Sequence, residues 1–243
     1  MELIKLTNRI YYLPHDETND RCVIGYISGK NFAIMVDAGA SKTHVNLFFD
    51  ELQKNSLQKP DFCVLTHWHW DHTYGLHATD TISIATTETN KLLKEMMFWT
   101  WSEEEMLNRI EQGKDLKFSY PFQNIEYPDK TQICIKPATI EFKEELNLDL
   151  GDHTITLKKI ENSHSSDCCI IHIPAEKYVF LGDIIYEDLM PETPVYYQSK
   201  HKRLVSELNL LDFDIALTGH QPPMSRSQLF DQLVLDETSI VLE

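Results

Sequence analysis

The stretch that decides the fold is 66-THWHWDH-72, in which three histidines, two tryptophans and one aspartate occupy neighbouring positions. It continues an apolar run, 61-DFCVLT-66, that is typical of a buried strand. Alternate side chains of an extended chain share a face, so positions 67, 69 and 71 would point to one side, 68 and 70 to the other, and His72 would enter from the turn. Converging imidazoles and a carboxylate suit a divalent metal such as Zn2+. The stretch therefore predicts a metal site at a strand end.

Other polar residues follow, or nearly follow, apolar strand patterns elsewhere in the chain. They are Asp37 after FAIMV, His164 in NSHSSD, Asp183 after KYVFLG and His220 in ALTGHQ. Loops at strand ends gather functional groups on a rigid scaffold, so we expect these side chains to approach residues 66–72. Taken alone, each of them is also typical of a turn or helix-capping position. For Asp37, this structural interpretation is as well supported as a role at the metal site.

Strand and helix patterns succeed one another without a linker or a low-complexity segment. Strand patterns occur at 9–13, 22–28, 32–39, 61–66, 82–85, 138–142, 153–160, 168–174, 177–183 and 214–219, and helical patterns at 41–55, 86–97, 199–212 and from about 225. The stretch from about 98 to 128 has no strand period, and Ser102 with Glu105 resembles a capping box, which indicates an insertion. Strand-rich halves closed by helices predict two packed sheets with helices outside, in one domain of residues 1–243.

The ordered set of Asp37, HWHWDH, His164, Asp183 and His220 resembles the signature of the metallo-β-lactamase superfamily, over nearly the whole chain. The resemblance implies an α+β fold, a four-layer αββα sandwich, with a helical insertion at about 98–128. It also implies two divalent metal ions, for which the nitrogen and oxygen ligands suit Zn2+ and would also accept Fe or Mn. Matched residue by residue, the family pattern implies that His67, His69 and His164 bind one metal and that Asp71, His72 and His220 bind the second. Asp183 would bridge the two metals.

This ligand set implies a binuclear hydrolase. Two cations a few ångströms apart lower the pKa of a bridging water toward about 7, so that a metal-bridging hydroxide is present at neutral pH. The catalytic candidates are Asp71, which in the family is thought to orient the attacking water or relay a proton, and Asp37, which would orient the site from behind the ligands. The positive charge that the ligands leave uncompensated would attract anionic substrates.

The net charge of the chain disfavours some classes of binding partner. With 22 Lys+Arg against 38 Asp+Glu the formal net charge is −16, which disfavours binding to nucleic acid and to anionic membranes. No apolar run approaches the length of a membrane span, and the odd count of 5 cysteines without a CxxC spacing is typical of a reducing compartment. We therefore expect a cytoplasmic protein that acts on a small molecule.

The substrate classes left open are an ester, a thioester, a lactone or an amide. A true β-lactamase is one alternative, although the subclass that the 164-HSSD-167 stretch resembles has Cys at the position of Asp183 and Lys at that of Tyr186. Another alternative is a mononuclear iron oxidoreductase or a non-hydrolytic metal-binding protein on the same fold. Oxygen-reducing di-iron relatives carry Glu where this chain has His69, which weighs against a redox role.

Aromatic residues in two segments are candidates for substrate contact. Trp99 and Trp101 lie in the insertion stretch MMFWTWSEEEM and would form an apolar lid over the metals, or would pack the insertion onto the sandwich. Tyr186 and Tyr196 follow Asp183 and would reach a substrate or a reaction intermediate.

Overall fold

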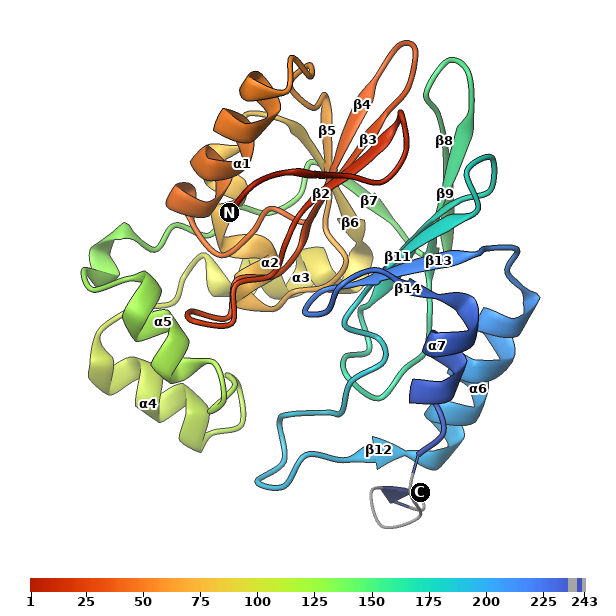
Figure 1. The fold of residues 1–243 in the computed structure, drawn as a ribbon. Coiled ribbons are helices and arrows are strands. Elements are labelled where there is room, and N and C mark those ends of the chain that lie inside the picture. Colours follow the sequence, from red (N-terminus) through yellow and green to blue (C-terminus); the bar gives the residue numbers. More distant parts are fainter. Residues whose placement is uncertain (236–239, 242–243) are drawn as a thin grey trace.

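The computed structural model describes residues 1–235 and 240–241, and two large sheets form its centre (Figure 1). The strands of the first sheet follow chain order and are β1 (Ile4–Lys5), β2 (Ile10–Leu13), β3 (Ile24–Ser28), β4 (Ala33–Val36), β5 (Phe62–Val64), β6 (Ile82–Thr86) and β7 (Ile140–Phe142). The pairs from β1 to β4 are antiparallel and those from β4 to β7 are parallel. Parallel strands need crossovers, and α1 (Lys42–Lys54) and α3 (Thr87–Met96) lie in two of them.

The second sheet has the order β14, β13, β11, β10, β9, β8. Its strands are β8 (Glu145–Asp149), β9 (Thr154–Lys159), β10 (Cys169–Ile173), β11 (Tyr178–Gly182), β13 (Ile215–Thr218) and β14 (Met224–Ser225). Only β8, among the strands of this sheet longer than two residues, had no counterpart among the predicted patterns. It is an edge strand whose side chains are at most half-buried, so its apolar signal is weak.

The two sheets pack face to face through a continuous apolar layer. Ile34, Val64 and Ile84 of the first sheet belong to the same buried cluster as Leu157 and Ile171 of the second. The approach is close enough to require a glycine, because a Cβ at position 25 of β3 would lie 2.4 Å from the ring of Phe180.

Helices cover the outer face of each sheet, which confirms the predicted α+β fold with four layers. Val45 and Phe48 of α1 and Leu93 of α3 pack on the first sheet. Leu204 of α6 (Gln198–Leu210) and Leu229 of α7 (Arg226–Gln232) pack on the second. Figure 1 shows these helices on opposite sides of the paired sheets. Apolar side chains at helical spacing thus bury one stripe of each helix against a sheet.

The predicted insertion is helical, with α4 (Glu103–Glu111), α5 (Tyr120–Glu126) and the short 3-10 helix η2 (Lys130–Gln132) between β6 and β7. Ser102 caps α4, since its hydroxyl accepts a hydrogen bond from the backbone N–H of Glu105. Figure 1 shows α4 and α5 beside the sandwich, on the side of α1 and α3. The two short strands β12 (Tyr196–Tyr197) and β15 (Ile240–Val241) pair in parallel outside both sheets. No helix in the described part of the chain combines the length and hydropathy needed to cross a membrane.

Candidate metal centre

The HWHWDH motif lies on a loop and one helical turn, and not on a continued strand. β5 ends at Val64, and the chain enters α2 (Trp70–Thr73) with His69 as its N-cap, after which it continues in the 3-10 helix η1 (Tyr74–Ala78). The extended conformation expected beyond the strand end is therefore wrong, although the predicted separation of the polar side chains from the two tryptophans is found. The loop and the helical turn nevertheless bring all four polar side chains of the motif together, and Trp68 and Trp70 are buried in the cluster beneath the first sheet.

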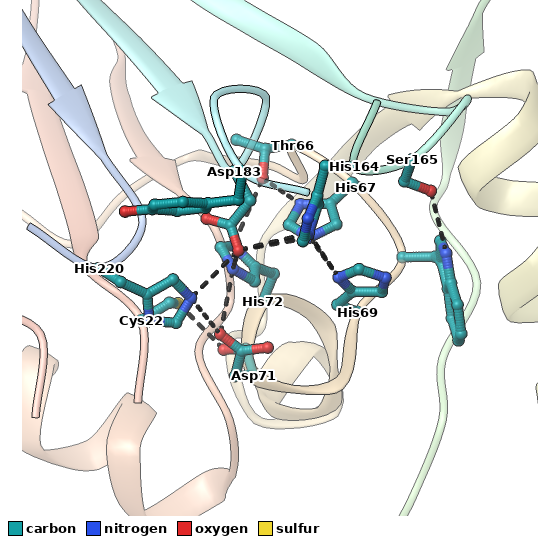
Figure 2. A network of polar contacts seen from close by, with 12 residues as sticks. Cys22, Thr66, His67, His69, Asp71, His72, His164, Ser165, Asp183 and His220 are labelled. Atoms are coloured by element: carbon teal, nitrogen blue, oxygen red, sulfur yellow. Dashed lines mark hydrogen bonds and ion pairs between the residues drawn. The ribbon is translucent and has the colours of Figure 1, made fainter. Parts of the chain in front are cut away.

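Three imidazole nitrogens converge at the first cluster (Figure 2). Nδ1 of His69 lies 2.9 Å from Nε2 of His67 and 2.9 Å from Nε2 of His164. The opposite nitrogen of two rings is already engaged, because Nδ1 of His164 donates to the Glu187 carbonyl at 2.8 Å and Nδ1 of His67 lies 3.0 Å from the Thr66 hydroxyl. Such contacts fix the orientation of a ligating ring and leave its other nitrogen for a metal.

The second cluster contains Asp71, His72 and His220. Oδ2 of Asp71 lies 3.1 Å from Nε2 of His72 and 3.3 Å from Nε2 of His220. Asp71 and His72 are buried, while His220 remains partly exposed at the start of the loop that follows β13. The ligands predicted for a second metal thus meet in space although His220 comes from the opposite sheet.

Asp183 stands between the two clusters. Its Oδ2 lies 3.9 Å from Nε2 of His67 and 3.6 Å from that of His164 on one side, and 3.4 Å from Nε2 of His72 and 3.1 Å from that of His220 on the other. Figure 2 shows the carboxylate directed between the rings.

The backbone around Asp183 is shaped for this approach. Gly182 has a φ of +53°, and a Cβ at Gly219 would lie 2.0 Å from Oδ1 of Asp183. Larger side chains at these two positions would strain the turn or displace the carboxylate.

The donor atoms fit divalent cations. Nitrogen ligands of a tetrahedral Zn2+ lie about 2.0–2.1 Å from the ion and hence about 3.3 Å from each other, close to the separations of the first cluster. Oδ2 of Asp71, Nε2 of His72 and Oδ1 of Asp183 are buried without a hydrogen-bond partner among the described residues. Buried polar groups without partners are costly, and a cation at each cluster would satisfy them.

Burial and charge set the protonation of the ligands. Burial lowers the pKa of His67 and of His69 well below the usual value, so both rings are neutral and have a lone pair to offer. Burial opposes ionisation of Asp183, but the charges of His220 and His72 outweigh it and hold the pKa of Asp183 well below its usual range. The carboxylate is therefore ionised.

The histidines of the second cluster behave differently. Burial lowers the pKa of His72 and of His220, but the negative charge of neighbouring carboxylates outweighs burial and raises both pKa values. The strongest such neighbour is Asp71 for His72 and Asp183 for His220. A cation at this cluster would compete with these protons, because ligands must be deprotonated to bind metal.

Asp37 lies directly behind His72. Its Oδ2 is 2.8 Å from Nδ1 of His72, and its two oxygens also accept hydrogen bonds from the backbone N–H and the hydroxyl of Thr66, at 2.7 and 3.0 Å. Asp37 adopts a φ of +62°, a left-handed conformation that aspartate tolerates better than most residues. Its position is that of a residue that orients a ligand.

Three residues near the centre were not singled out from the sequence. Nδ1 of His220 lies 3.2 Å from Nδ1 of His15 and 3.5 Å from Oδ1 of Asp20, and Cys22 donates from Sγ to the backbone carbonyl of Asp71 at 3.0 Å. Burial, followed by the charge of Asp71, raises the pKa of Asp20 to about 7. All three belong to the connection 14-PHDETNDRCV-23 between β2 and β3, where a cluster of polar residues between two buried strands was the available signal.

A cavity of about 360 Å³ opens beside the candidate metal ligands. The ligands that reach it are His69, Asp71, His164, Asp183 and His220, and its remaining walls are Asp20, Leu116, Phe118, Ser119, Tyr186, Glu187, Leu189 and Gln221. The insertion therefore does contribute to the cavity, through the segment between α4 and α5.

The aromatic candidates divide between the cavity and the core. Tyr186 lines the cavity, whereas Trp99 and Trp101 are not among its walls; they pack against the first-sheet cluster and next to each other, with Arg109 over both rings. The structure thus favours packing over a lid for the two tryptophans. Tyr196 is also outside the cavity walls, and its hydroxyl donates to the Ile185 carbonyl at 3.2 Å.

Residues 18–220 match the family described as the metallo-beta-lactamase superfamily, and the chain belongs to it. Among curated proteins it is similar to the acyl-coenzyme A thioesterase MBLAC2 of Homo sapiens, with 22% identity over 230 residues that cover 88% of this chain and 78% of the relative. The superfamily is largely hydrolytic, and the His/Asp clusters described above are suited to divalent metal ions.

Solved structures share the fold at low identity. The metallo-beta-lactamase DIM-1 aligns with a TM-score of 0.65 and 21% identity, covering 98% of both chains, and a metallo-beta-lactamase from Pontibacter korlensis with 0.63 and 17%, covering 96% of both. The sec-alkylsulfatase Pisa1 from Pseudomonas sp. has a TM-score of 0.70 and 12% identity over 96% of this chain and 41% of its own.

Proposed function

We propose that residues 1–243 act as one domain, a binuclear, zinc-dependent hydrolase of small acyl thioesters. The observation that carries the proposal is the position of Asp183, whose Oδ2 lies within 3.1–3.9 Å of ring nitrogens from both ligand clusters. A single carboxylate that faces two sets of imidazoles can be shared by two cations. His67, His69 and His164 would hold one, and Asp71, His72 and His220 the other.

Two divalent cations so held would supply a hydroxide nucleophile at neutral pH and a Lewis acid for the substrate carbonyl. Asp71 faces the cavity with an ionised carboxylate, so it is placed to orient a water or to accept its proton. Burial raises its pKa, but the charges and hydrogen bonds of His72 and His220 hold it below the usual range. Asp37 supports the reaction through the orientation of His72.

The cavity supports an acyl substrate. Leu116, Phe118 and Leu189 form apolar walls, and Tyr186 stands beside the ligands. No lysine or arginine occurs among the cavity walls in the described part of the chain, so a bound anionic group would depend on the metals for its positive partner. The similarity to an acyl-coenzyme A thioesterase favours a thioester over an amide or a lactone.

A reducing, cytoplasmic location agrees with the cysteines. All five are free thiols, and Cys22, Cys63, Cys168 and Cys169 are buried. The proposed partner is therefore a small cytoplasmic thioester, with no nucleic acid or membrane required.

The test combines metal content with a matched substrate panel. Protein purified without chelator is analysed for Zn, Fe and Mn, and assayed with an acyl-coenzyme A, the same acyl group on N-acetylcysteamine, its oxygen ester, a lactone and nitrocefin. We expect two Zn per chain and thioester turnover that is lost on chelation and restored by Zn2+.

Other outcomes would favour the alternatives. Nitrocefin turnover without thioester turnover would indicate a β-lactamase. One Fe per chain without hydrolysis of any of these substrates would contradict the proposal and favour an iron oxidoreductase. Preference for the N-acetylcysteamine thioester over the coenzyme A thioester would show that the protein recognises the acyl group and not the coenzyme A part of the substrate.

A further inference from the structure

We propose that Cys22 is an additional ligand of the second metal position, which it shares with Asp71 and His72, so that this position binds thiophilic metals in preference to Mn2+ or Fe2+. The inference deepens the proposed function, because it rests on a metal centre at this site. Cys22 precedes β3 and approaches from the side of the cluster away from the first metal position.

Geometry places the sulfur among ligand atoms. Sγ of Cys22, a carboxylate oxygen of Asp71 and a ring nitrogen of His72 all lie within 4.8 Å of one another, and the three residues are buried. A tetrahedral ion with bonds of about 2.1 Å to nitrogen and about 2.3 Å to sulfur keeps these ligands about 3.6 Å apart, which is within that reach. Among the described residues, Cys22 is the only cysteine that belongs to such a group.

Two unpartnered atoms point to a cation at this place. Oδ2 of Asp71 and Nε2 of His72 are buried and form no hydrogen bond of acceptable geometry, although they are 3.1 Å apart. Asp71 is 4% exposed and His72 is fully buried, so water does not satisfy them readily. A cation bound by these atoms would lie next to the thiol.

The backbone holds Cys22 in place. The N–H of Val23 donates to the carbonyl of Gly219 at 2.7 Å, which ties this segment to the loop of His220. The thiol donates to the carbonyl of Asp71 at 3.0 Å, which ties it to the turn of the motif. Cys22 is thus positioned from both sides by the segments that present the other ligands of the second position.

Ligation would exchange one bond for another. The S–H bond breaks, a sulfur–metal bond forms with the electron pair of sulfur, and one proton leaves to the solvent; a coordinating thiol is deprotonated by its metal. The oxidation state of sulfur and metal is unchanged. Because thiolate is a soft ligand, the site would favour Zn2+, Co2+ or Cd2+ over the harder Mn2+.

The first experiment is the absorption spectrum of the Co2+-loaded protein. We expect a sulfur-to-cobalt charge-transfer band in the near ultraviolet together with the visible d–d bands of bound Co2+. Cys22→Ser retains a hydrogen-bond donor for the Asp71 carbonyl and should lose the charge-transfer band while it keeps the visible bands. Cys63→Ser, a change of a buried cysteine on β5, is the matched control and should keep both.

The second experiment measures the competition between Cd2+ and Mn2+. Loss of outer partners of a ligand already changes metal affinity by 10–100-fold, so Cys22→Ser should lower the Cd2+ to Mn2+ affinity ratio at least about tenfold. Cys22→Ala, which also removes the hydrogen bond, should lower it as well, and a circular dichroism spectrum verifies folding of each variant.

The outcomes separate this inference from the proposed function. Visible cobalt bands without a charge-transfer band, or a charge-transfer band that survives Cys22→Ser, would overturn the role of Cys22 and leave the metal centre intact. Absence of all cobalt bands and of bound metal in the wild-type protein would overturn both.

Discussion

Two buried clusters of charged residues lie near each other in this protein, and they neutralise their charge in different ways. The cluster within the helical insertion contains its own cation: the guanidinium of Arg109 lies 4.5 Å from the ring of Trp99 and 4.8 Å from that of Trp101, donates to the Thr100 carbonyl at 2.7 Å, and is 3.9 Å from Asp115. Arginine is always charged and stacks well on aromatic rings, so this cluster contains a permanent cation that the chain itself supplies.

The cluster at the strand ends contains no such permanent cation. Within the described residues, the ion pairs of Asp37, Asp71 and Asp183 are all formed with histidines. Neutral imidazoles offer lone pairs and cannot compensate carboxylates, so the charge balance there depends on protons or on bound cations. The two clusters therefore differ in the source of their positive charge, which is an arginine of the chain in the first and protons or bound cations in the second.

The largest effect on stability is expected from Arg109→Ala. The change leaves Asp115 buried without its cation and removes the guanidinium that stacks on both tryptophan rings, so the free energy of unfolding should fall by about 3–5 kcal/mol. Urea unfolding of the holoprotein measures this loss. Arg203→Ala is the control, because the exposed pair of Arg203 with Glu161 should contribute within about 1 kcal/mol. Equal losses in the two variants would contradict the distinction between the clusters.

Asp183→Ala should disable the metal cluster and leave the fold largely intact. Removal of the carboxylate between the clusters should lower kcat/KM for the thioester and metal occupancy together, kcat/KM by at least about a hundredfold, since changes of outer partners alone cost 10–100-fold. Metal analysis and steady-state kinetics measure both quantities. Asp212→Ala, at an exposed carboxylate, is the control. Turnover that survives the loss of Asp183 would exclude a shared carboxylate.

Asp115 should make stability depend on pH in a direction opposite to that of an ordinary paired carboxylate. Burial raises its pKa from 3.8 to about 6, so the folded state binds the proton more tightly than the unfolded state. Its contribution is therefore fully present below about pH 4 and is lost, on the order of 2–3 kcal/mol, as the pH rises through about 6.

Asp115→Asn tests this dependence. An asparagine oxygen still accepts the hydrogen bond that Oδ1 of Asp115 accepts from the backbone N–H of Leu116, and it does not titrate. Urea midpoints of the two proteins, compared between about pH 4 and pH 7, should show a decline with pH that the variant lacks. Parallel pH profiles would show that Asp115 does not titrate in this range.

The smallest effect should follow from Asp37→Asn, which acts on the metal cluster through the contact of Asp37 with His72. Asp37 accepts three hydrogen bonds, and an amide that must donate from one of its two atoms cannot satisfy all three. Zn2+ affinity should fall by about 10–100-fold, with kcat/KM partly restored at high Zn2+. Thr66→Val removes the hydroxyl, which contacts both Asp37 and Nδ1 of His67, so it should also lower the Zn2+ affinity. An unchanged affinity in Asp37→Asn would remove Asp37 from the set of orienting residues.

Local patterns predicted the layers well and the positions of side chains less well. The helices at 41–55 and 199–212 were readable because each buries one apolar face with the helical period, and most long strands because they are short continuous apolar runs buried on both faces. The edge strand β8 was missed because little of it is buried. The extended chain expected beyond Val64 was wrong because the backbone turns into α2 there, yet the predicted separation of the polar side chains from Trp68 and Trp70 is found.

By itself, the sequence determined the fold class and the candidate ligands, because a metal site requires particular donor atoms and those atoms can be read directly from residue types. Only the tertiary structure decided which partners surround them. It placed Asp183 between two clusters, brought Cys22 beside Asp71, and turned Trp99 and Trp101 toward Arg109 and away from the cavity. These contacts join residues far apart in the chain, and their geometry follows from the packing of two sheets and the course of their loops, which no local pattern encodes.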